Sequence, residues 1–334
     1  MKEEHSKSIH LSRRKFIGSS ALLATGFISG AGQLIAGPAY IKNLNKPNSL
    51  INGVQIGVIT YSYRSLPDQS AEATLKYVVD SGISAIELMG EPVESFAGAP
   101  VSRVDRMAYF QLMRKSREGG ELDESEKKQM EDMRAQMDAH SKEVANWRAS
   151  VSMDKFTQLK KMYLDAGVKI YCFKPSAFGS RNTEAEMDYG FRAAKALGAT
   201  HVSLEHPGDD QQTKKLGDLA AKHKIYVAYH GHEQQTPTFW DTALTQSKYN
   251  ALNLDAGHYV AADNPNVLDI IQSKSSRIAS MHIKDRQTPA NGKGNLPWGQ
   301  GDTPLVEILK LMSTKKYKFP ATIELEYQVP EGSD

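Results

Sequence analysis

Eight short apolar segments recur along the chain after residue 53, and polar or charged residues follow each of them. Several are introduced by a phrase in which a glycine ends a helix, as in Asp80-Ser-Gly82-Ile. Such a glycine supplies the left-handed C-cap, and an apolar strand begins within a few residues. The predicted strands are Gln55–Thr60, Ala85–Met89, Val168–Phe173, Thr200–Leu204, Ile225–Tyr229, Ala251–Leu254, Ile278–Ile283 and Ala321–Glu326.

Most of these strands begin about 25 to 45 residues after the one before, which leaves room for one helix in each connection. The first connection contains an amphipathic helix from about Ala71 to Ser81. An alternation of this kind predicts an α/β fold with parallel strands. Eight repeats favour a (β/α)₈ TIM barrel over residues 54–334, whose functional site would lie at the carboxyl ends of the strands.

The second connection is longer than the others, because 78 residues separate Met89 from Val168. It contains a charged block from Asp123 to Trp147, in which Asp123 and Glu126 have the spacing of a capping box. Methionines and other apolar residues then recur at helical spacing, as is typical of a packed helix face. We expect an elaborated connection that packs over the rim of the barrel and helps to close the site.

Residues 1–37 differ in character from the rest. Ser12-Arg13-Arg14-Lys15-Phe16-Ile17 has the form of a twin-arginine export signature, and a moderately apolar stretch rich in Gly, Ala and Ser follows it. This stretch is better suited to a removable signal than to a stable membrane anchor. We therefore expect a signal peptide at 1–37, a linker at 38–53 and a periplasmic or otherwise exported protein.

Composition and charge narrow the class of protein. Hydrophobic residues make up 40% of the chain and charged residues 24%, as in soluble globular proteins. One cysteine, Cys172, excludes an internal disulfide and a cysteine-based zinc site. Residues 1–37 have a net charge of +3 and the whole chain +2, so the chain without them is near −1. This balance disfavours nucleic acid as a partner.

Carboxylates and imidazoles stand where the later predicted strands end. Because one rim would receive a ligand from each strand, the pattern predicts one divalent metal ion at the barrel mouth, with Mn, Mg, Co and Zn as candidates. The strand-end residues of this kind are Glu205, His230, His232, Asp255, His258, His282, Glu324 and Glu326.

Asp255-Ala-Gly-His258 is the most informative local pattern. Asp255 follows an apolar strand, and His258 comes three residues later on the turn, where it would face a substrate. An aspartate that only caps the next helix, beside a surface histidine, is the alternative interpretation. His282 comes 27 residues after Asp255, the length of one βα unit, and Arg286 would lie over the site and bind a hydroxyl, carboxylate or phosphate group.

Glu324 and Glu326 differ by two positions, so both point to one face of the last predicted strand. Two inward carboxylates in an apolar segment require a metal or a cationic partner. Either Glu205 or His230 would complete the metal set, and the sequence leaves this choice open. Lys174 ends the third strand and would bind a sugar oxygen or form a salt bridge on the rim.

These strand ends resemble the xylose isomerase-like TIM barrels, the sugar phosphate isomerase/epimerase superfamily that also contains endonuclease IV. The resemblance covers about residues 54–330 and rests on four short motifs. They are Leu254-Asp255-Ala-Gly-His258, His282-Ile-Lys-Asp285-Arg286, Gly299-Gln-Gly301 and Ile323-Glu324-Leu-Glu326.

The resemblance implies that Asp255, His282 and Glu324 are three of four metal ligands, and that His258 and Arg286 contact the substrate. Epimerase-like members have a glutamate where this chain has His230, which is a departure from the family pattern. Glu205 and Glu326 are then the candidates for moving protons.

The implied activity is that of a metal-dependent isomerase or epimerase that abstracts a proton beside a sugar carbonyl. With a leaving group β to that carbon the same chemistry is a lyase reaction, for example on a 3-keto-glycoside. Export favours free or oxidised sugars as substrates. A sugar-binding barrel without turnover and an endonuclease IV-like phosphodiesterase are the alternatives, and a homo-oligomer is possible.

Overall fold

The computed structural model describes residues 46–264 and 266–328. The proposed signal peptide at 1–37 and the first half of the predicted linker, residues 38–45, lie outside the described residues.

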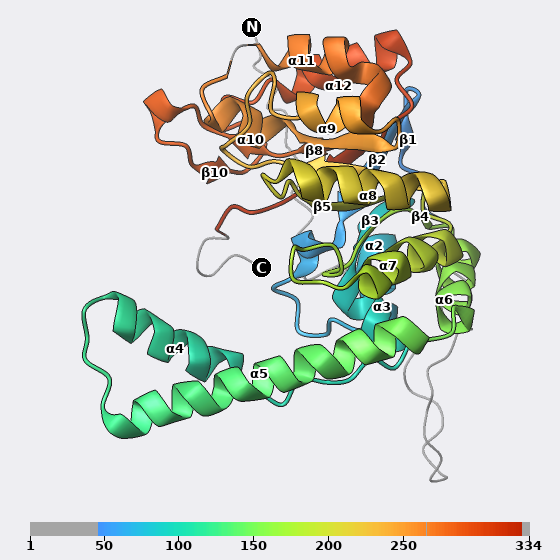
Figure 1. The fold of residues 1–334 in the computed structure, drawn as a ribbon. Helices are drawn as coiled ribbons and strands as arrows, with labels where there is room; N and C mark the ends of the chain where they lie inside the picture. Colours follow the sequence, from blue (N-terminus) through green and yellow to red (C-terminus); the bar gives the residue numbers. More distant parts are fainter. Residues whose placement is uncertain (1–45, 265, 329–334) are drawn as a thin grey trace, which may run out of the picture. The chain divides into compact units, whose positions relative to one another are not determined.

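Eight parallel strands form a closed barrel, as the alternation of apolar segments predicts (Figure 1). The last strand pairs with the first, with Ala321 opposite Ile56, and the first pairs with the second, so the sheet has no open edge. The barrel strands are β2 (Val54–Ile59), β3 (Ala85–Met89), β4 (Lys169–Lys174), β5 (His201–Glu205), β6 (Tyr226–His230), β7 (Asn250–Asp255), β8 (Ile278–Ile283) and β11 (Ala321–Ile323).

Helices connect the barrel strands, and their apolar faces form one core with the strands. Several helices begin at side-chain caps, such as Ser70 before α2 and Thr183 before α7. The helices are α2 (Ala71–Asp80), α3 (Gly90–Phe96), α4 (Arg106–Arg117), α5 (Glu124–Ser150), α6 (Asp154–Asp165), α7 (Glu184–Leu197), α8 (Asp210–His223), α9 (Asp241–Gln246), α10 (Ala256–Ala261), α11 (Val267–Lys274) and α12 (Leu305–Lys315).

Short elements complete the fold. Strand β1 (Leu50–Ile51) pairs antiparallel with β2, and β9 (Asp285–Arg286) pairs antiparallel with β10 (Asn295–Leu296) just beyond β8. Single 3₁₀ turns are η3 (Thr60–Tyr63), η4 (Ser275–Arg277) and η5 (Pro289–Asn291). None of the helices among the described residues is both long and apolar enough to cross a membrane.

The barrel interior is partly polar. The hydroxyl of Tyr171 lies 2.7 Å from that of Thr322 across the barrel, and His201 Nε2 lies 2.9 Å from Ser280 Oγ. Gly57 makes room for the tyrosine, because a Cβ at this position would lie 2.5 Å from the Tyr171 hydroxyl. Polar groups inside a closed barrel need such partners, and these are satisfied within the protein.

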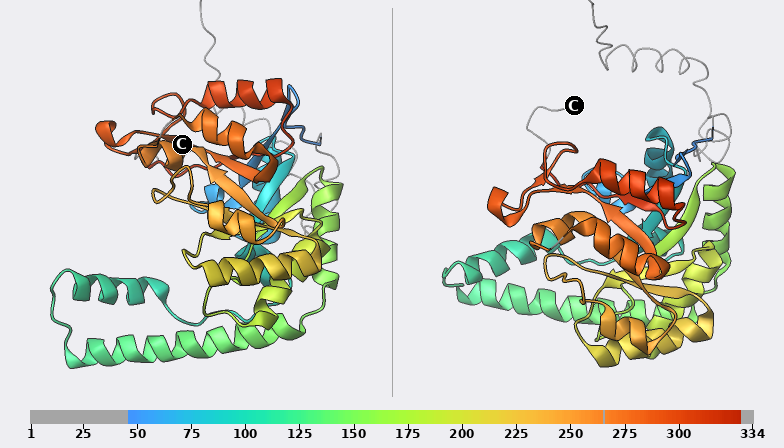
Figure 2. Two further views of the ribbon diagram at one scale, coloured as in Figure 1. Left: turned by 45° about the horizontal axis from the view of Figure 1, so that its top comes forward. Right: turned by 90° about the horizontal axis from the view of Figure 1, so that it is seen from above.

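The long second connection is a helical hairpin, and its first part differs from our expectation. The capping box at the start of α5 is confirmed, with Asp123 and Glu126 bonded to each other's backbone amides. Helix α4 lies beside the first half of α5 in all the views (Figures 1 and 2) and has no buried residue. The second half of α5 packs against α7. In the part of the chain that the structure describes, the hairpin therefore packs on an outer helix, and the expected cover over the rim is not formed.

The last strand is shorter than predicted. It ends at Ile323, so Glu324 and Glu326 lie just beyond it and not within it. Both carboxylates nevertheless reach the same ammonium group, that of Lys284, so they do point to one side as predicted.

Candidate metal and substrate site at the barrel mouth

Four strand ends bring four ligand-type side chains together. His230 ends β6, Asp255 ends β7, His282 lies in β8 and Glu324 follows β11. These strands are neighbours in the closed sheet, and one ligand atom from each residue lies within 4.8 Å of those of the other three. All four residues are buried. Two imidazoles and two carboxylates form a donor set suited to a borderline or hard divalent cation.

His230, and not Glu205, is the fourth residue of this group. Glu205 lies on the rim, where Oε1 accepts a hydrogen bond from Lys174 Nζ at 2.9 Å. Its other oxygen is 3.5 Å from Nε2 of His232, and its side chain is 49% exposed. Lys174 therefore adopts the salt-bridged arrangement, the second of the two options that its sequence position left open.

Asp255 has two roles that follow from its place between a strand and a helix. Its Oδ1 accepts a hydrogen bond from the His258 amide at 2.7 Å and caps α10. Its Oδ2 is buried and accepts no hydrogen bond, although Lys284 Nζ lies 3.2 Å away. Burial, together with the charge of Glu324, raises the pKa of Asp255. The ion pair with Lys284 leaves this oxygen without the hydrogen bond that a buried charge also needs, and a bound cation would supply a further partner.

His282 bridges two buried carboxylates. Its Nδ1 lies 3.0 Å from Glu324 Oε2, and its Nε2 lies 2.9 Å from Glu87 Oε2. Burial alone would lower the pKa of His282, but Glu87 and Glu324 outweigh it and raise that pKa to about 10. Burial likewise opposes the charge of Glu87, yet His282 holds the pKa of this carboxyl at about 2.

Sequence reasoning missed Glu87. It lies in the middle of β3, is completely buried, and accepts hydrogen bonds from Ser203 and Asn253 as well as from His282. The available signal was its position as the one acidic residue in Ala85–Met89, an otherwise apolar strand. The rule that barrel sites lie at strand ends does not indicate this residue, because it lies one layer below those ends.

The buried charges fit a divalent cation. Glu87, Asp255 and Glu324 are three buried carboxylates, and Lys284 is the buried ammonium beside them. A histidine that binds a metal is neutral. With His282 neutral, two negative charges remain uncompensated, which is the charge of one divalent ion.

Lys284 connects the metal-type group to the rim and was not among the predicted site residues. Its ammonium lies 2.7 Å from Glu324 Oε2, 2.6 Å from Glu326 Oε2 and 2.9 Å from His258 Nε2. Burial opposes its charge, but Asp255 and the two glutamates raise its pKa. Lys284 comes two positions after His282, so the period of a strand directs both side chains to one side.

Arg286, which we expected to lie over the site and bind a substrate group, forms hydrogen bonds within the protein. Its Nη1 lies 2.5 Å from His258 Nδ1, while Nη2 donates to Glu233 at 2.7 Å and to the Lys293 carbonyl at 2.5 Å. Burial, with help from Lys284, lowers the pKa of His258 to about 2. In this arrangement Arg286 orients a neutral His258 and joins the loops after β6 and β9.

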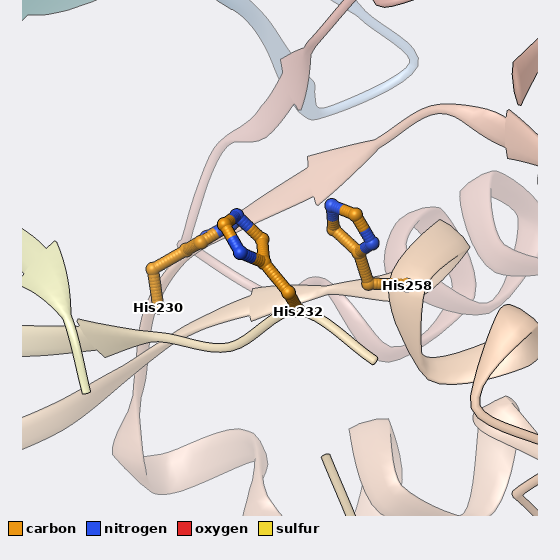
Figure 3. A group of neighbouring side chains, drawn as sticks. All are labelled: His230, His232 and His258. Carbon is orange, nitrogen blue, oxygen red and sulfur yellow. The ribbon is translucent and has the colours of Figure 1, made fainter. Parts of the chain in front are cut away.

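Three histidines form a second group at the mouth (Figure 3). His230, His232 and His258 each offer a nitrogen within 4.8 Å of the others, and the rings of His232 and His258 are 4.5 Å apart between centroids. Lys284 and Arg286, however, contact the two ring nitrogens of His258. These cations make this group a poorer cation site than the first and better suited to polar groups of a substrate.

Asp285 fixes the loop that follows the site. Its Oδ2 accepts hydrogen bonds from the amides of Gly299, Gln300 and Gly301, and its Oδ1 accepts one from Thr303. A Cβ on Gly301 would lie 2.3 Å from Asp285 Oδ1, so this close approach requires glycine. The Gly-Gln-Gly turn noted in the sequence is therefore an anchor for the strand-end segment that contains Arg286.

A protein-family model matches more than half of the chain. Residues 109–333 match the model described as xylose isomerase-like TIM barrel. The chain belongs to this family. The resemblance drawn from the four sequence motifs is thereby confirmed, and so is the predicted barrel. A search of the curated proteins gave no match.

Solved structures share the fold at low sequence identity. A xylose isomerase domain protein from Alicyclobacillus acidocaldarius is 13% identical with a TM-score of 0.54, over 84% of this chain and 91% of that one. The 3-keto-D-glucoside 4-epimerase of E. coli is 9% identical with a TM-score of 0.53, over 83% and 94%. The probable 3-DHS dehydratase of Bacillus anthracis is 14% identical with a TM-score of 0.53, over 81% and 92%.

Proposed function

We propose that this chain is a metal-dependent sugar isomerase or epimerase that removes a proton beside a sugar carbonyl. His230, Asp255, His282 and Glu324 would hold the divalent metal. The observation that carries the proposal is their convergence in the buried interior, with an Asp255 oxygen that accepts no hydrogen bond. Such a metal would act as a Lewis acid that polarises the carbonyl and makes the neighbouring C–H acidic.

Two carboxylates on the rim are placed to move protons. Glu326 contacts Lys284 at 2.6 Å and lies 3.8 Å from His258, whereas Glu205 contacts Lys174 and His232. The paired rings of His232 and His258 lie between them. Glu326 would take a proton from carbon, and Glu205 would return one. Return to the same carbon from the other face inverts it. Return to the adjacent carbon, with transfer of the hydroxyl proton from one oxygen to the other, gives the isomer.

Cations adjacent to these carboxylates support the assignment. The ammonium of Lys284 lies 2.6 Å from Glu326 and places a positive charge beside the proposed base. The neutral His258, with Arg286 at its Nδ1, would donate a hydrogen bond from Nε2 to a sugar hydroxyl that replaces Lys284 there. Where the carbanion has a leaving group on the next carbon, the same residues would catalyse elimination, which is the lyase form of the proposal.

The substrate class rests on the family and on the names of its solved neighbours. These include a 3-keto-D-glucoside 4-epimerase and a D-psicose 3-epimerase crystallised in the presence of D-fructose. We propose a free or oxidised sugar as substrate and expect it to be met outside the cytoplasm, because of the twin-arginine signature. A barrel that binds sugar without turnover is the competing function.

Metal content tests the first half of the proposal. The purified wild-type protein, reloaded with Mn²⁺ and dialysed, should contain about one metal ion per chain, and Asp255→Asn should contain much less. An equal metal content in the two proteins would remove Asp255 from the site.

Hydrogen exchange tests the second half. The wild-type protein should incorporate deuterium from D₂O at a carbon-bound position of at least one member of a panel of ketoses, aldoses and 3-keto-glycosides. Binding of a sugar without any exchange or product would instead support the sugar-binding barrel.

A further inference from the structure

Glu87 lies directly below the four ligand-type residues and receives hydrogen bonds from three different strands. Its Oε1 accepts from Ser203 Oγ at 2.6 Å, its Oε2 accepts from His282 Nε2 at 2.9 Å, and Asn253 Nδ2 lies 3.0 and 3.1 Å from the two oxygens. Its side chain is completely buried. A carboxylate that accepts this many bonds is held in one orientation.

The contact with Glu87 determines that Nε2 of His282 carries a proton. A carboxylate only accepts hydrogen bonds, so Nε2 of His282 must carry a proton. The other nitrogen, Nδ1, lies 3.0 Å from Glu324 and 3.8 Å from Asp255 Oδ2, and a cation bound among these atoms would displace its proton while Glu87 keeps the one on Nε2. The lone pair of a neutral His282 is thus directed at the group of ligand atoms.

The same carboxylate acts on the second histidine through an amide. Asn253 must point its NH₂ group at Glu87, because both carboxylate oxygens are acceptors. Its Oδ1 consequently faces His230 Nδ1 at 3.4 Å and favours a proton there. The lone pair of His230 is left on Nε2, the nitrogen on the other side of the ring.

We infer that Glu87 is the positioning residue of this centre, setting His282 directly and His230 through Asn253 so that both present a lone pair to one divalent cation. The inference rests on the metal site of the proposed function and adds to it a residue that does not bind the metal. Glu87 also contributes a full negative charge below the ligand group. Carboxylates that receive the second N–H of a metal-binding histidine increase the basicity of the ligand nitrogen.

The experiment compares the Mn²⁺ affinity of wild type, Glu87→Gln, Asn253→Ala and Ser280→Ala, measured by calorimetry on metal-free protein. The amide of Glu87→Gln keeps the size of the side chain but loses the charge. It also places an NH₂ group against the groups that donate hydrogen bonds to Glu87 in wild type. We expect its affinity to fall about 10- to 100-fold, with a smaller loss in Asn253→Ala, which keeps the bond between Glu87 and His282.

Ser280→Ala is the matched control. Ser280 is completely buried on β8, and its hydroxyl bonds His201 one layer below the site, with no contact to Glu87. The variant loses a buried side-chain hydrogen bond as Asn253→Ala does, but its Mn²⁺ affinity should match that of wild type. The visible spectrum of bound Co²⁺ gives a second readout, which should change in Glu87→Gln and stay unchanged in Ser280→Ala.

The outcomes separate this inference from the proposed function. A wild-type protein that binds no divalent metal would overturn both. Wild-type affinity and an unchanged Co²⁺ spectrum in a folded Glu87→Gln protein would overturn only the positioning role. Should Glu87→Gln fail to fold, Asn253→Ala tests the inference instead. Equal Mn²⁺ affinities in Asn253→Ala and Ser280→Ala would exclude the relay to His230 and so overturn the inference that Glu87 sets both histidines.

Discussion

Glu324 and Glu326 are two positions apart and both contact Lys284, yet they differ in exposure. The side chain of Glu324 is 7% exposed and that of Glu326 is 25% exposed. Glu324 also lies 3.0 Å from Nδ1 of His282, whereas Glu326 faces His258 on the rim. The deeper carboxylate is therefore placed to bind metal and the outer one to meet a substrate.

The two glutamine variants test this division. We expect Glu326→Gln to keep its metal and to lose turnover by about 10²- to 10⁴-fold, because the amide retains the shape and removes the base. Glu324→Gln should lose metal as well as activity, since a neutral amide is a poor replacement for an anionic ligand. Metal analysis and deuterium exchange on the same preparations measure both effects. The opposite pattern would mean that the two roles are reversed.

His201 is a buried histidine that lies outside the ligand group. Burial lowers the pKa of His201 to about 4, from an ordinary value of 6.5. Between these pH values the unfolded chain binds a proton at this position and the folded chain does not. The stability associated with a neutral His201 is therefore fully present above pH 6.5 and is lost as the pH falls toward 4.

The corresponding prediction uses His201→Gln, which cannot titrate. From pH 7 to pH 4, the free energy of unfolding of wild type should fall by up to about 3 kcal/mol more than that of the variant. Urea denaturation of both proteins in the presence of a chelator measures the difference. A difference between the two proteins that does not vary with pH would contradict the assignment.

At the scale of elements, the strands could be predicted because each is a short apolar segment, and a glycine ends the helix before several of them. The positions of Asp255 and His282 followed from the rule that barrel sites lie at strand ends. His230 and Glu205 both satisfied that rule, and only the tilt and pairing of the strands separate them. Glu87 was not predictable from the same rule, because its importance comes from side chains on three other strands.

The hairpin of α4 and α5 was predictable as helix but not in its placement, because tertiary contacts at one end of α5 set its position. Arg148, near that end, is 5% exposed. It donates two hydrogen bonds to Glu94 in α3, and one each to Glu186 in α7 and to the Ser176 carbonyl. This ion cluster joins α5 to two other helices.

Loss of the Arg148 side chain should therefore lower the stability of the fold. In Arg148→Met the two glutamates remain partly or fully buried without their cation, and we expect a loss of about 3–5 kcal/mol in the free energy of unfolding. The matched variant is Arg114→Met, which breaks an exposed ion pair with Glu118 in the same hairpin and should cost at most about 1 kcal/mol. Similar losses in the two variants, measured by urea denaturation, would show that the buried cluster does not anchor α5.

For the whole molecule, the proposed metal site and the export signature have a common consequence. The proposed centre combines side chains from several strands, namely His230, Asp255, His282 and Glu324 with Glu87 and Lys284 beside them. It therefore forms only when the barrel has folded. The twin-arginine route transports folded proteins, so a protein of this kind would obtain its metal before export. We propose export by this route, with a mature chain that begins between about Ala36 and Asn48.

Replacing both arginines by lysine, as Arg13→Lys with Arg14→Lys, tests the route without changing the charge of the segment. We expect the precursor to accumulate in the cytoplasm, because the signature depends on the arginine pair and not on positive charge alone. Lys7→Arg is the control, since it changes a basic residue of the same segment outside the pair, and its export should be normal. Cell fractionation with detection of precursor and mature forms measures the outcome. If the double variant reaches the periplasm as efficiently as wild type, the pair is incidental, and the case for an extracellular sugar as substrate loses its support while the metal site stays as it is.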